Sequence, residues 1–281
     1  MIDVASCIHV SVVHYSPLTL RKQTLSALEQ DFPNLNWVTE KDILAKGTAK
    51  YRFEKEIRLT TEFDFAAGLR LNSFSQHFSR RKSQALVSIL KLLGKFHTRA
   101  AKSILGALPA KKPLPQNWRE VALMHIKAIE MGIQSGKPWI LVLEDDAIIQ
   151  ANFLDSLQVV EKLSTNSKVW VNLNDGLGPN LFKNKSDRLI GFHGFYQVNP
   201  PTTRCTVAYL IDQSLAVAIL NELEVYGIPD WIPIDFTLDA IVKKLSINCF
   251  WQDPACVLQG SSNGNYASNL QQFRRAQPKK L

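Results

Sequence analysis

The chain has 281 residues, of which 46 % are hydrophobic and 21 % are charged, and its net charge is +8. This balance is typical of a globular protein with a sizeable core, and it excludes disordered and fibrous proteins. The apolar run at residues 139–143 is far too short to cross a bilayer.

The first residues and the cysteines are the features from which we predict the cellular compartment. The beginning of the sequence, MIDVASCIHV, lacks the basic and long apolar regions of a signal peptide. The four cysteines, Cys7, Cys205, Cys249 and Cys256, form no CxxC pair and no Cys/His cluster with zinc spacing. We therefore expect free thiols in a reducing compartment, which makes the cytoplasm the default location.

The first elements predict the fold class. Residues 7–16 have the alternating, β-rich pattern of a strand that ends at Ser16-Pro17, residues 18–30 show helical spacing, and LNWVTE (35–40) reads as a second strand. A β-α-β opening predicts an α/β fold with a largely parallel sheet.

Positive charge is concentrated in the next part of the chain. Residues 65–119 contain eleven lysines and arginines and no acidic residue, so the rest of the chain is slightly acidic. Within them, residues 79–112 place apolar residues at every third or fourth position among the basic ones, which predicts a basic amphipathic helical insert. Three roles are open for this insert: a solvated basic face, a surface that binds an anionic membrane, or a nucleic-acid-binding element. Nucleic acid is not expected, because the insert lacks interleaved aromatic residues and any known motif.

The second half alternates between helices and strands. We predict helices at 117–134, 152–163, 213–223 and 232–246, and strands at 140–143, 168–174, 202–212 and about 247–252. Asn152 is a candidate N-cap. These elements complete one domain, residues 1–270, and residues 271–281 form a basic tail.

Three consecutive carboxylates, Glu144, Asp145 and Asp146, follow the predicted buried strand at 140–143. In open α/β sheets, ligands bind at the carboxyl ends of the strands. Adjacent carboxylates repel each other unless a divalent cation, basic side chains or backbone donors neutralise them. Mg2+ or Mn2+, held by one or two carboxylates with water and phosphate oxygens, suits such a cluster. The alternative is a solvated strand end that caps the next helix.

Residues 119–154, REVALMHIKAIEMGIQSGKPWILVLEDDAIIQANFL, resemble the core of glycosyltransferase family 25, which includes lipooligosaccharide galactosyltransferases. The family has an ALSH-like motif on a helix and a strand that ends in LEDD, and these stand here as ALMH (122–125) and LEDDA (143–147). VSVVHYSPLTLRKQTLSALEQ, TVAYLIDQSLAVAIL, PIDFTLD and CVLQGSS are similar to further family segments in the same order. Met124 replaces the family's serine, and residues 68–112 have no counterpart.

The resemblance implies a GT-A-type nucleotide-sugar-binding fold with a mostly parallel central sheet. It implies inverting transfer of a hexose, from UDP-galactose or UDP-glucose, to a lipooligosaccharide or other cell-surface glycan. Mn2+ or Mg2+ on the donor diphosphate would be held by Asp146 together with Glu144 or Asp145. Glu144 is alternatively a contact to the donor ribose.

Inverting transfer also requires a base that removes the proton of the acceptor hydroxyl. Asp235, in the PID sequence that matches the family's PVD, is the first candidate, and its alternative role is a plain helix N-cap. Asp239, one turn later, and Asp230 are the other candidates.

The remaining candidates each have a structural alternative. His125 is placed near the donor by the resemblance, or is a core histidine bonded to the backbone. Arg21 reaches a phosphate or lies on a solvated face. Gln259 bonds a sugar hydroxyl or closes a loop. Asn172 and Asn174 point the same way from a strand, so they line a sugar site or face water.

The sequence as a whole predicts a metal-dependent glycosyltransferase with a nucleotide-sugar donor and a glycan or glycolipid acceptor. It is cytoplasmic, and contact of residues 79–112 with an anionic membrane would place it on the inner face of the cell membrane. The rival enzyme is a nucleotidyltransferase, although residues 14–19, HYSPLT, form no glycine-rich phosphate loop. The rival without activity is a basic membrane- or nucleic-acid-binding module with an inactive sugar-nucleotide-binding core.

Overall fold

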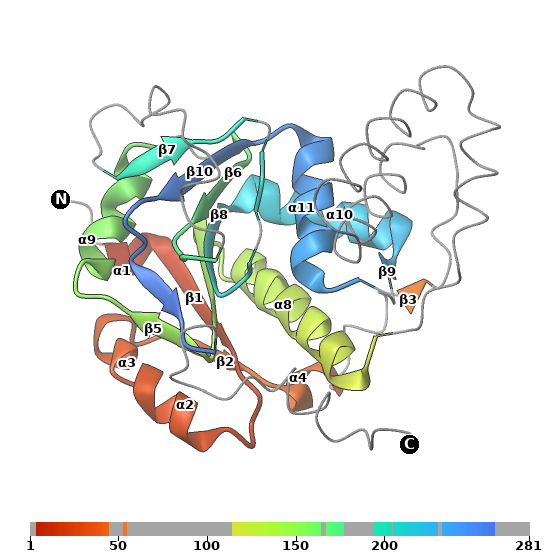
Figure 1. Ribbon diagram of the computed structural model, residues 1–281, viewed down its shortest axis with the longest axis horizontal. Helices are drawn as coiled ribbons and strands as arrows, with labels where there is room; N and C mark the ends of the chain where they lie inside the picture. Colours follow the sequence, from red (N-terminus) through yellow and green to blue (C-terminus); the bar gives the residue numbers. More distant parts are fainter. Residues whose placement is uncertain are drawn as a thin grey trace, which may run out of the picture.

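A seven-stranded mixed sheet forms the centre of the protein, in the order β2-β1-β4-β8-β6-β10-β7 (Figure 1). The computed structural model describes residues 4–44, 53–54, 114–163, 167–176, 194–199, 201–203, 205–229 and 232–261. The strands are β1 (Ile8–Val13), β2 (Asn36–Val38), β4 (Trp139–Glu144), β6 (Val169–Asn172), β7 (Phe195–Gln197), β8 (Ala208–Asp212) and β10 (Asn248–Gln252). β1, β2, β4, β6 and β10 run in one direction, whereas β8 and β7 run against their neighbours.

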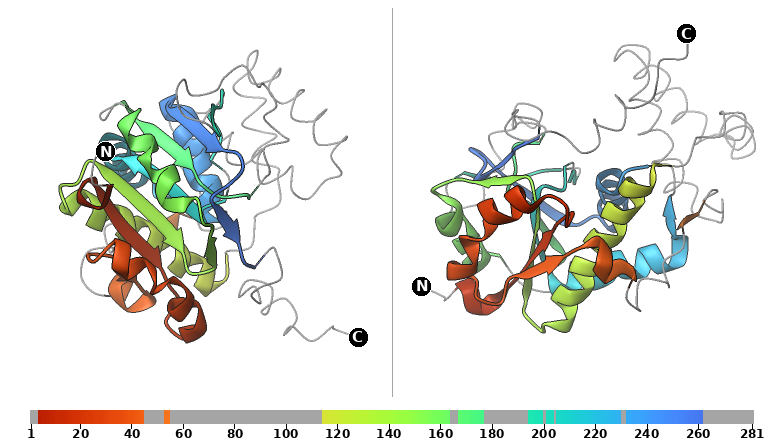
Figure 2. Two further views of the ribbon diagram at one scale, coloured as in Figure 1. Left: turned by 90° about the vertical axis from the view of Figure 1, so that its left-hand side faces the viewer. Right: turned by 90° about the horizontal axis from the view of Figure 1, so that it is seen from below.

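Helices cover both faces of this sheet (Figures 1 and 2). One face carries α2 (Thr19–Leu25), α3 (Leu28–Asp31), α9 (Phe153–Leu157) and the 3-10 turn η2 (Gln158–Glu161). The other carries α4 (Glu40–Leu44), α8 (Gln116–Gln134), α10 (Gln213–Tyr226) and α11 (Ile234–Leu245). The helix α1 (Val4–Cys7) precedes β1. The protein is therefore a layered α/β structure, as the sequence predicts at this level.

Two short strand pairs lie outside the main sheet. β5 (Ala147–Ile149) pairs antiparallel with β11 (Val257–Gln259), and β3 (Phe53–Glu54) pairs parallel with β9 (Ile228–Pro229). The first pair begins directly after the carboxylate triplet, so it ties the end of β4 to a distant part of the chain.

Alternation along β4 explains why both faces are buried. Trp139, Leu141 and Leu143 belong to the hydrophobic core under α2 and α9, whereas Ile140 and Val142 belong to the core under α8. At Gly132, α8 lies so close to β4 that an added Cβ atom would come within 2.5 Å of the Ile140 side chain. The helix that carries ALMH is thereby held tightly against the strand that carries LEDD.

Most predicted elements are confirmed, but their lengths differ. The helix predicted at 18–30 is two short helices, α2 and α3, and the one predicted at 152–163 is α9 followed by η2. Asn152 stands at the N-cap of α9, but its side chain makes no capping hydrogen bond. The closing loop after β10 contains a strand, β11, and neither β5 nor β7 was predicted.

The basic insert (79–112) and the basic tail (271–281) lie outside the described residues, so their predicted structures stay predictions. Within the described ranges, none of the helices has both the length and the apolar character that crossing a bilayer requires.

Candidate active site

The three carboxylates at the end of β4 diverge. Glu144 continues the alternation of Ile140 and Val142 and lies on the α8 face, where it approaches His125 of that helix. Asp145 turns toward α2 on the opposite face. Asp146 lies beside the chain that follows β11. The charges are thus distributed among three different surroundings, which reduces their mutual repulsion.

Asp145 is neutralised by the protein itself. Its Oδ1 accepts a hydrogen bond from Arg21 Nη1 at 2.7 Å, and its Oδ2 lies 3.1 Å from both His14 Nδ1 and the backbone N–H of Tyr15. Arg21 and Asp145 are both buried, so this ion pair is part of the frame that joins α2 to the end of β4. Arg21 is therefore paired with a carboxylate, and its alternative position on a solvated face is wrong.

Asp146 is buried, and the described residues give a hydrogen-bond donor to only one of its two carboxylate oxygens. Its Oδ2 accepts a hydrogen bond from the N–H of Ser261 at 3.3 Å, while no described residue donates a hydrogen bond to its Oδ1. Burial and then the charge of Glu144 raise the pKa of Asp146 from 3.8 to about 6. A buried polar atom without a partner costs about 1–3 kcal/mol, and more when it is charged. A cation bound at Oδ1 would remove that cost.

Glu144 faces a cavity of about 310 Å3 at this edge of the sheet. Its Oε1 accepts a hydrogen bond from the Thr206 hydroxyl at 2.5 Å and lies 3.3 Å from His125 Nε2. The geometry at His125 Nε2 is not that of a hydrogen bond, and this nitrogen has no other partner among the described residues. The Glu144 side chain is 24 % exposed, so it is accessible from the cavity.

The cavity brings together three of the predicted site residues: Glu144, Asp235 and Gln259. Its other walls are largely apolar and come from α8, from the segment before β8 and from the start of α11 (Trp118, Val121, Cys205, Thr206, Val207, Pro233, Ile234 and Phe236). An apolar hollow with two carboxylates and an amide at its edge can hold a hydroxylated ring and act on one of its hydroxyl groups.

Asp235 is the carboxylate opposite Glu144 in this cavity, and it is half-buried. Pro233 occupies the N-cap position of α11, so Asp235 lies inside the first turn and the prediction of a plain N-cap is wrong. The positive end of the helix dipole stabilises its negative charge and fixes its position.

Asp239, the second candidate base, is buried and does not line the cavity. Its oxygens accept hydrogen bonds from Lys243 Nζ at 2.6 Å and from the N–H of Thr203 at 2.9 Å. These contacts make it a structural residue that holds the 201–203 segment to α11. Asp230 lies outside the described residues.

The two asparagines are structural residues as well. Asn172 accepts a hydrogen bond from the Trp170 indole, and the Asn174 amide donates to the carbonyl oxygens of Cys205 and Ala208. Both side chains are buried and neither lines the cavity, so the two alternatives, a sugar site and a water-facing position, are both wrong.

His125 is completely buried within α8. Its Nδ1 lies 3.2 Å from the hydroxyl of Tyr209, so its partner is a side chain and not the backbone. The structure places it behind Glu144, where it approaches the site without reaching the cavity surface.

The described residues contain no group of three or more His, Cys, Asp or Glu side chains that could hold a metal by itself. Mg2+ and Mn2+ sites for phosphate substrates commonly use one or two carboxylates, with the remaining positions filled by water and substrate oxygens. Glu144 and Asp146, with the partnerless Oδ1 of the latter, fit this kind of site. Asp145 does not, because both its oxygens are already engaged.

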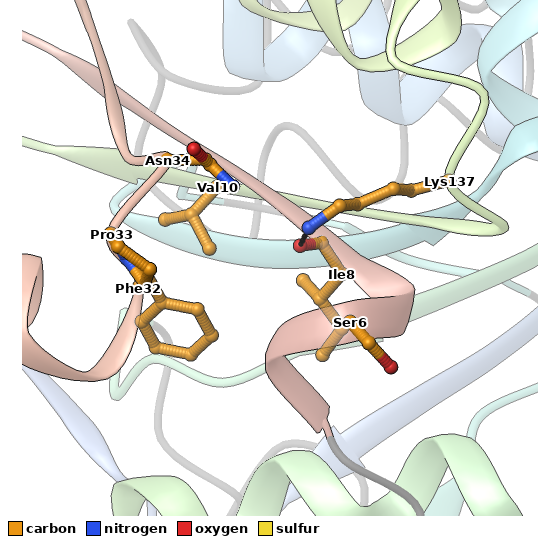
Figure 3. A pocket seen from close by; sticks show the side chains of 7 residues that line it. All are labelled: Ser6, Ile8, Val10, Phe32, Pro33, Asn34 and Lys137. Atoms are coloured by element: carbon orange, nitrogen blue, oxygen red, sulfur yellow. Dashed lines mark hydrogen bonds between the residues drawn. The ribbon is translucent and has the colours of Figure 1, made fainter.

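A second hollow, of about 340 Å3, lies at the opposite end of β1 and β4 (Figure 3). It has an apolar floor of Ile8, Val10 and Phe32, and Lys137 Nζ donates a hydrogen bond across it to the Ile8 carbonyl oxygen at 3.0 Å. None of the predicted site residues lines this hollow.

Several contributors were missed at the sequence level. Trp118 and Val121 precede His125 by seven and four residues, so the helical spacing of their face was a visible signal. Thr206 and Ser261 gave no such signal, because their roles depend on where loops approach the end of β4.

No protein-family model matches the chain, and no curated protein matches it either. The resemblance to glycosyltransferase family 25 therefore rests on the motifs alone.

Proposed function

We propose that the protein is a metal-dependent glycosyltransferase that moves a hexose from a nucleotide sugar, with a UDP-hexose as the expected donor, to a cell-surface glycan acceptor. The observation that carries the proposal is the buried Asp146 Oδ1, which lacks a hydrogen-bond partner among the described residues. The negative charge of Glu144, which lines the cavity, adds to the cost of ionising Asp146. A carboxylate in this state is suited to a cation ligand.

The sequence segments that resemble the family also support this function by their placement. The ALMH helix (α8), the LEDD strand (β4), the PID helix start (α11) and the Gln259 strand (β11) all contribute to the cavity or to its immediate support. These segments are far apart in the sequence. A shared binding site would explain why all of them resemble the same family.

Glu144 and Asp146 are the residues that would hold Mn2+ or Mg2+ on the donor diphosphate. The cation would offset the negative charge that develops on the leaving nucleoside diphosphate. Glu144 presents its carboxylate to the cavity, while the Ser261 amide fixes Asp146 through Oδ2 and leaves Oδ1 for the ligand.

Asp235 acts as the base that removes the proton of the acceptor hydroxyl. It lines the same cavity as Glu144, so the acceptor and the metal-bound donor would meet there. The apolar wall around Trp118 and Phe236 excludes water from the acceptor side, which favours transfer over hydrolysis.

The test is release of nucleoside diphosphate from a panel of UDP- and GDP-sugars, with and without Mn2+. We expect slow, Mn2+-dependent release of UDP that Asp146→Ala abolishes, whereas the exposed Asp155→Asn on α9 leaves it unchanged. Release of pyrophosphate from a nucleoside triphosphate would instead identify a nucleotidyltransferase. Mn2+-dependent binding without release from any sugar would identify an inactive sugar-nucleotide-binding core.

A further inference from the structure

We propose that His125 and Tyr209 are positioning residues that determine which oxygen of Glu144 faces the cavity. The inference rests on the proposed function of Glu144 as a ligand at the donor site, and it adds the buried residues that orient it. Neither His125 nor Tyr209 lines the cavity, so both act through Glu144.

Among the described residues, the side-chain contacts of the Glu144 carboxylate involve one oxygen, Oε1. Oε1 accepts the Thr206 hydroxyl hydrogen bond at 2.5 Å and lies 3.3 Å from His125 Nε2. Oε1 is therefore held by the segment before β8, through Thr206, and lies close to His125 of α8. Oε2 is the oxygen that remains for a ligand in the cavity.

The hydrogen positions on His125 follow from its two neighbours. A neutral imidazole carries one N–H, so either Nδ1 donates to Tyr209 or Nε2 carries the hydrogen and Tyr209 donates to Nδ1. Burial and the charge of Glu144 raise the pKa of Tyr209 well above 10, so its hydroxyl keeps its hydrogen. The carboxylate beside Nε2 favours the second arrangement, because a lone pair would repel Oε1 there.

The inner end of this chain of contacts is rigid. The Tyr209 ring stacks on Trp170 with centroids 4.5 Å apart and planes 13° apart, and the Trp170 indole N–H donates to Asn172. All three side chains are fully buried. Stacking and burial restrain Tyr209, so its hydroxyl at Nδ1 helps to orient the His125 ring, whose Nε2 lies 3.3 Å from Glu144 Oε1.

The proposal depends on the contact between His125 and Glu144. His125 Nε2 lies within reach of Oε1, but off the line of a hydrogen bond. A rotation of the Glu144 carboxylate that aligns Oε1 with Nε2–H would leave Oε2 as the oxygen available to a ligand in the cavity. Binding of a cation at Oε2 would select that rotamer and complete the buried hydrogen bond.

The test combines a tautomer measurement with ligand binding by three variants. In the full-length protein, the long-range 1H–15N spectrum of His125, assigned by comparison with His125→Gln, should show the hydrogen on Nε2. Tyr209→Phe should weaken this preference, because Nδ1 loses its hydrogen-bond donor while the Glu144 carboxylate still lies beside Nε2. His125→Leu and Tyr209→Phe should weaken Mn2+-dependent UDP binding about tenfold or more, as measured by calorimetry. His125→Gln, whose amide nitrogen replaces Nε2–H, should stay within about threefold of wild type.

Each outcome decides between the proposal and its opposite. A hydrogen on Nδ1 in the wild type would overturn it, and so would undiminished binding by His125→Leu. Equal loss in the Gln and Leu variants would show a packing role only. If the wild type binds no Mn2+–UDP, the proposed function fails, and the tautomer of wild type and Tyr209→Phe still tests the orientation of His125 independently.

Discussion

Arg21 and Asp145 are 124 residues apart in the sequence, yet Arg21 Nη1 lies 2.7 Å from Asp145 Oδ1. This buried pair anchors the first helix after β1 to the end of β4. It explains how the middle member of three adjacent acids is accommodated, and it leaves Glu144 and Asp146 as the two proposed metal ligands.

Removing one member of this pair should destabilise the protein strongly. Arg21→Leu leaves the Asp145 carboxylate buried beside neutral groups and His14, so we expect the free energy of unfolding to fall by about 3–5 kcal/mol. Urea denaturation measures it. Lys41→Ala removes the same charge from an exposed position and should change it by less than about 0.5 kcal/mol. An equal effect of both variants would contradict the structural role of the pair.

Asp146 should make the metal-free protein less stable as the pH rises. Its pKa is about 6 in the fold against 3.8 ordinarily, so the folded state holds the proton more tightly. The stabilising contribution of that proton is complete below pH 3.8 and is lost as the pH rises through about 6. Asp146→Asn should therefore be more stable than wild type at pH 7, by about 3 kcal/mol.

Comparing wild type with Asp146→Asn at each pH also removes the contribution of His9, whose pH dependence is opposite to that of Asp146. Burial, followed by the charge of Lys137, lowers the pKa of His9 from 6.5 to about 4, so its contribution is present above pH 6.5 and is lost as the pH falls through about 4. His9 is present in both proteins, so their difference in melting temperature reports Asp146 alone. A difference that does not change between pH 4 and 7 would contradict the assignment.

Asp235→Asn should separate turnover from donor binding. The variant cannot accept the hydroxyl proton, so we expect kcat to fall by about a hundredfold or more while the donor KM changes by less than about twofold. Asp239→Asn is the matched control: it loses the ion pair with Lys243, so it should lower the melting temperature and leave kcat near that of wild type. If Asp235→Asn weakens donor binding as much as turnover, Asp235 is a donor ligand and not the base.

Gly132→Ala should loosen the contact between α8 and β4. The added Cβ would meet three atoms of Ile140 at 2.5–2.6 Å, so the helix must shift, at a cost of about 1–3 kcal/mol in the free energy of unfolding. Gln134→Ala, at the exposed end of the same helix, should have almost no effect. Chemical denaturation of both variants is the measurement, and an unchanged Gly132→Ala protein would show that this contact adjusts freely.

The basic insert should bind anionic membranes. Replacing the nine lysines and arginines of residues 79–112 by glutamine removes the charge that attracts headgroups, so sedimentation with phosphatidylserine vesicles should fall sharply. Glutamine at Lys279 and Lys280 in the tail is the control and should have little effect. A charge-depleted protein that still sediments would contradict docking through this segment.

The sequence predicted the α/β layers well because periodicity reports burial directly. Ile140, Leu141, Val142 and Leu143 are buried on alternating sides, as a strand covered on both faces requires. Of the three carboxylates after that strand, Glu144 lines the cavity, whereas Asp145 and Asp146 do not. Local patterns determine the alternating burial of the strand, so no knowledge of distant contacts was needed for it.

The division of roles among the acids could not be read from the chain. Asp145 is neutralised by Arg21, Asp239 by Lys243, and Asp146 only in part by the Ser261 amide. These differences arise from long-range contacts, and similar sequence neighbourhoods give no indication of them. Asn172 and Asn174 were misjudged for the same reason, because their amides donate hydrogen bonds to the carbonyl oxygens of Thr202, Cys205 and Ala208.

The pairing of β5 with β11 sets the order in which the site can be completed during synthesis. Asp146 emerges from the ribosome 115 residues before Ser261, whose amide holds its Oδ2, and before the β11 strand that brings that amide into place. A nascent chain that ends at β8 already contains all three acids but not this clamp. Under the proposed function, a chain terminated before β11 therefore lacks the Ser261 amide that holds Asp146, and it should not bind the nucleotide sugar.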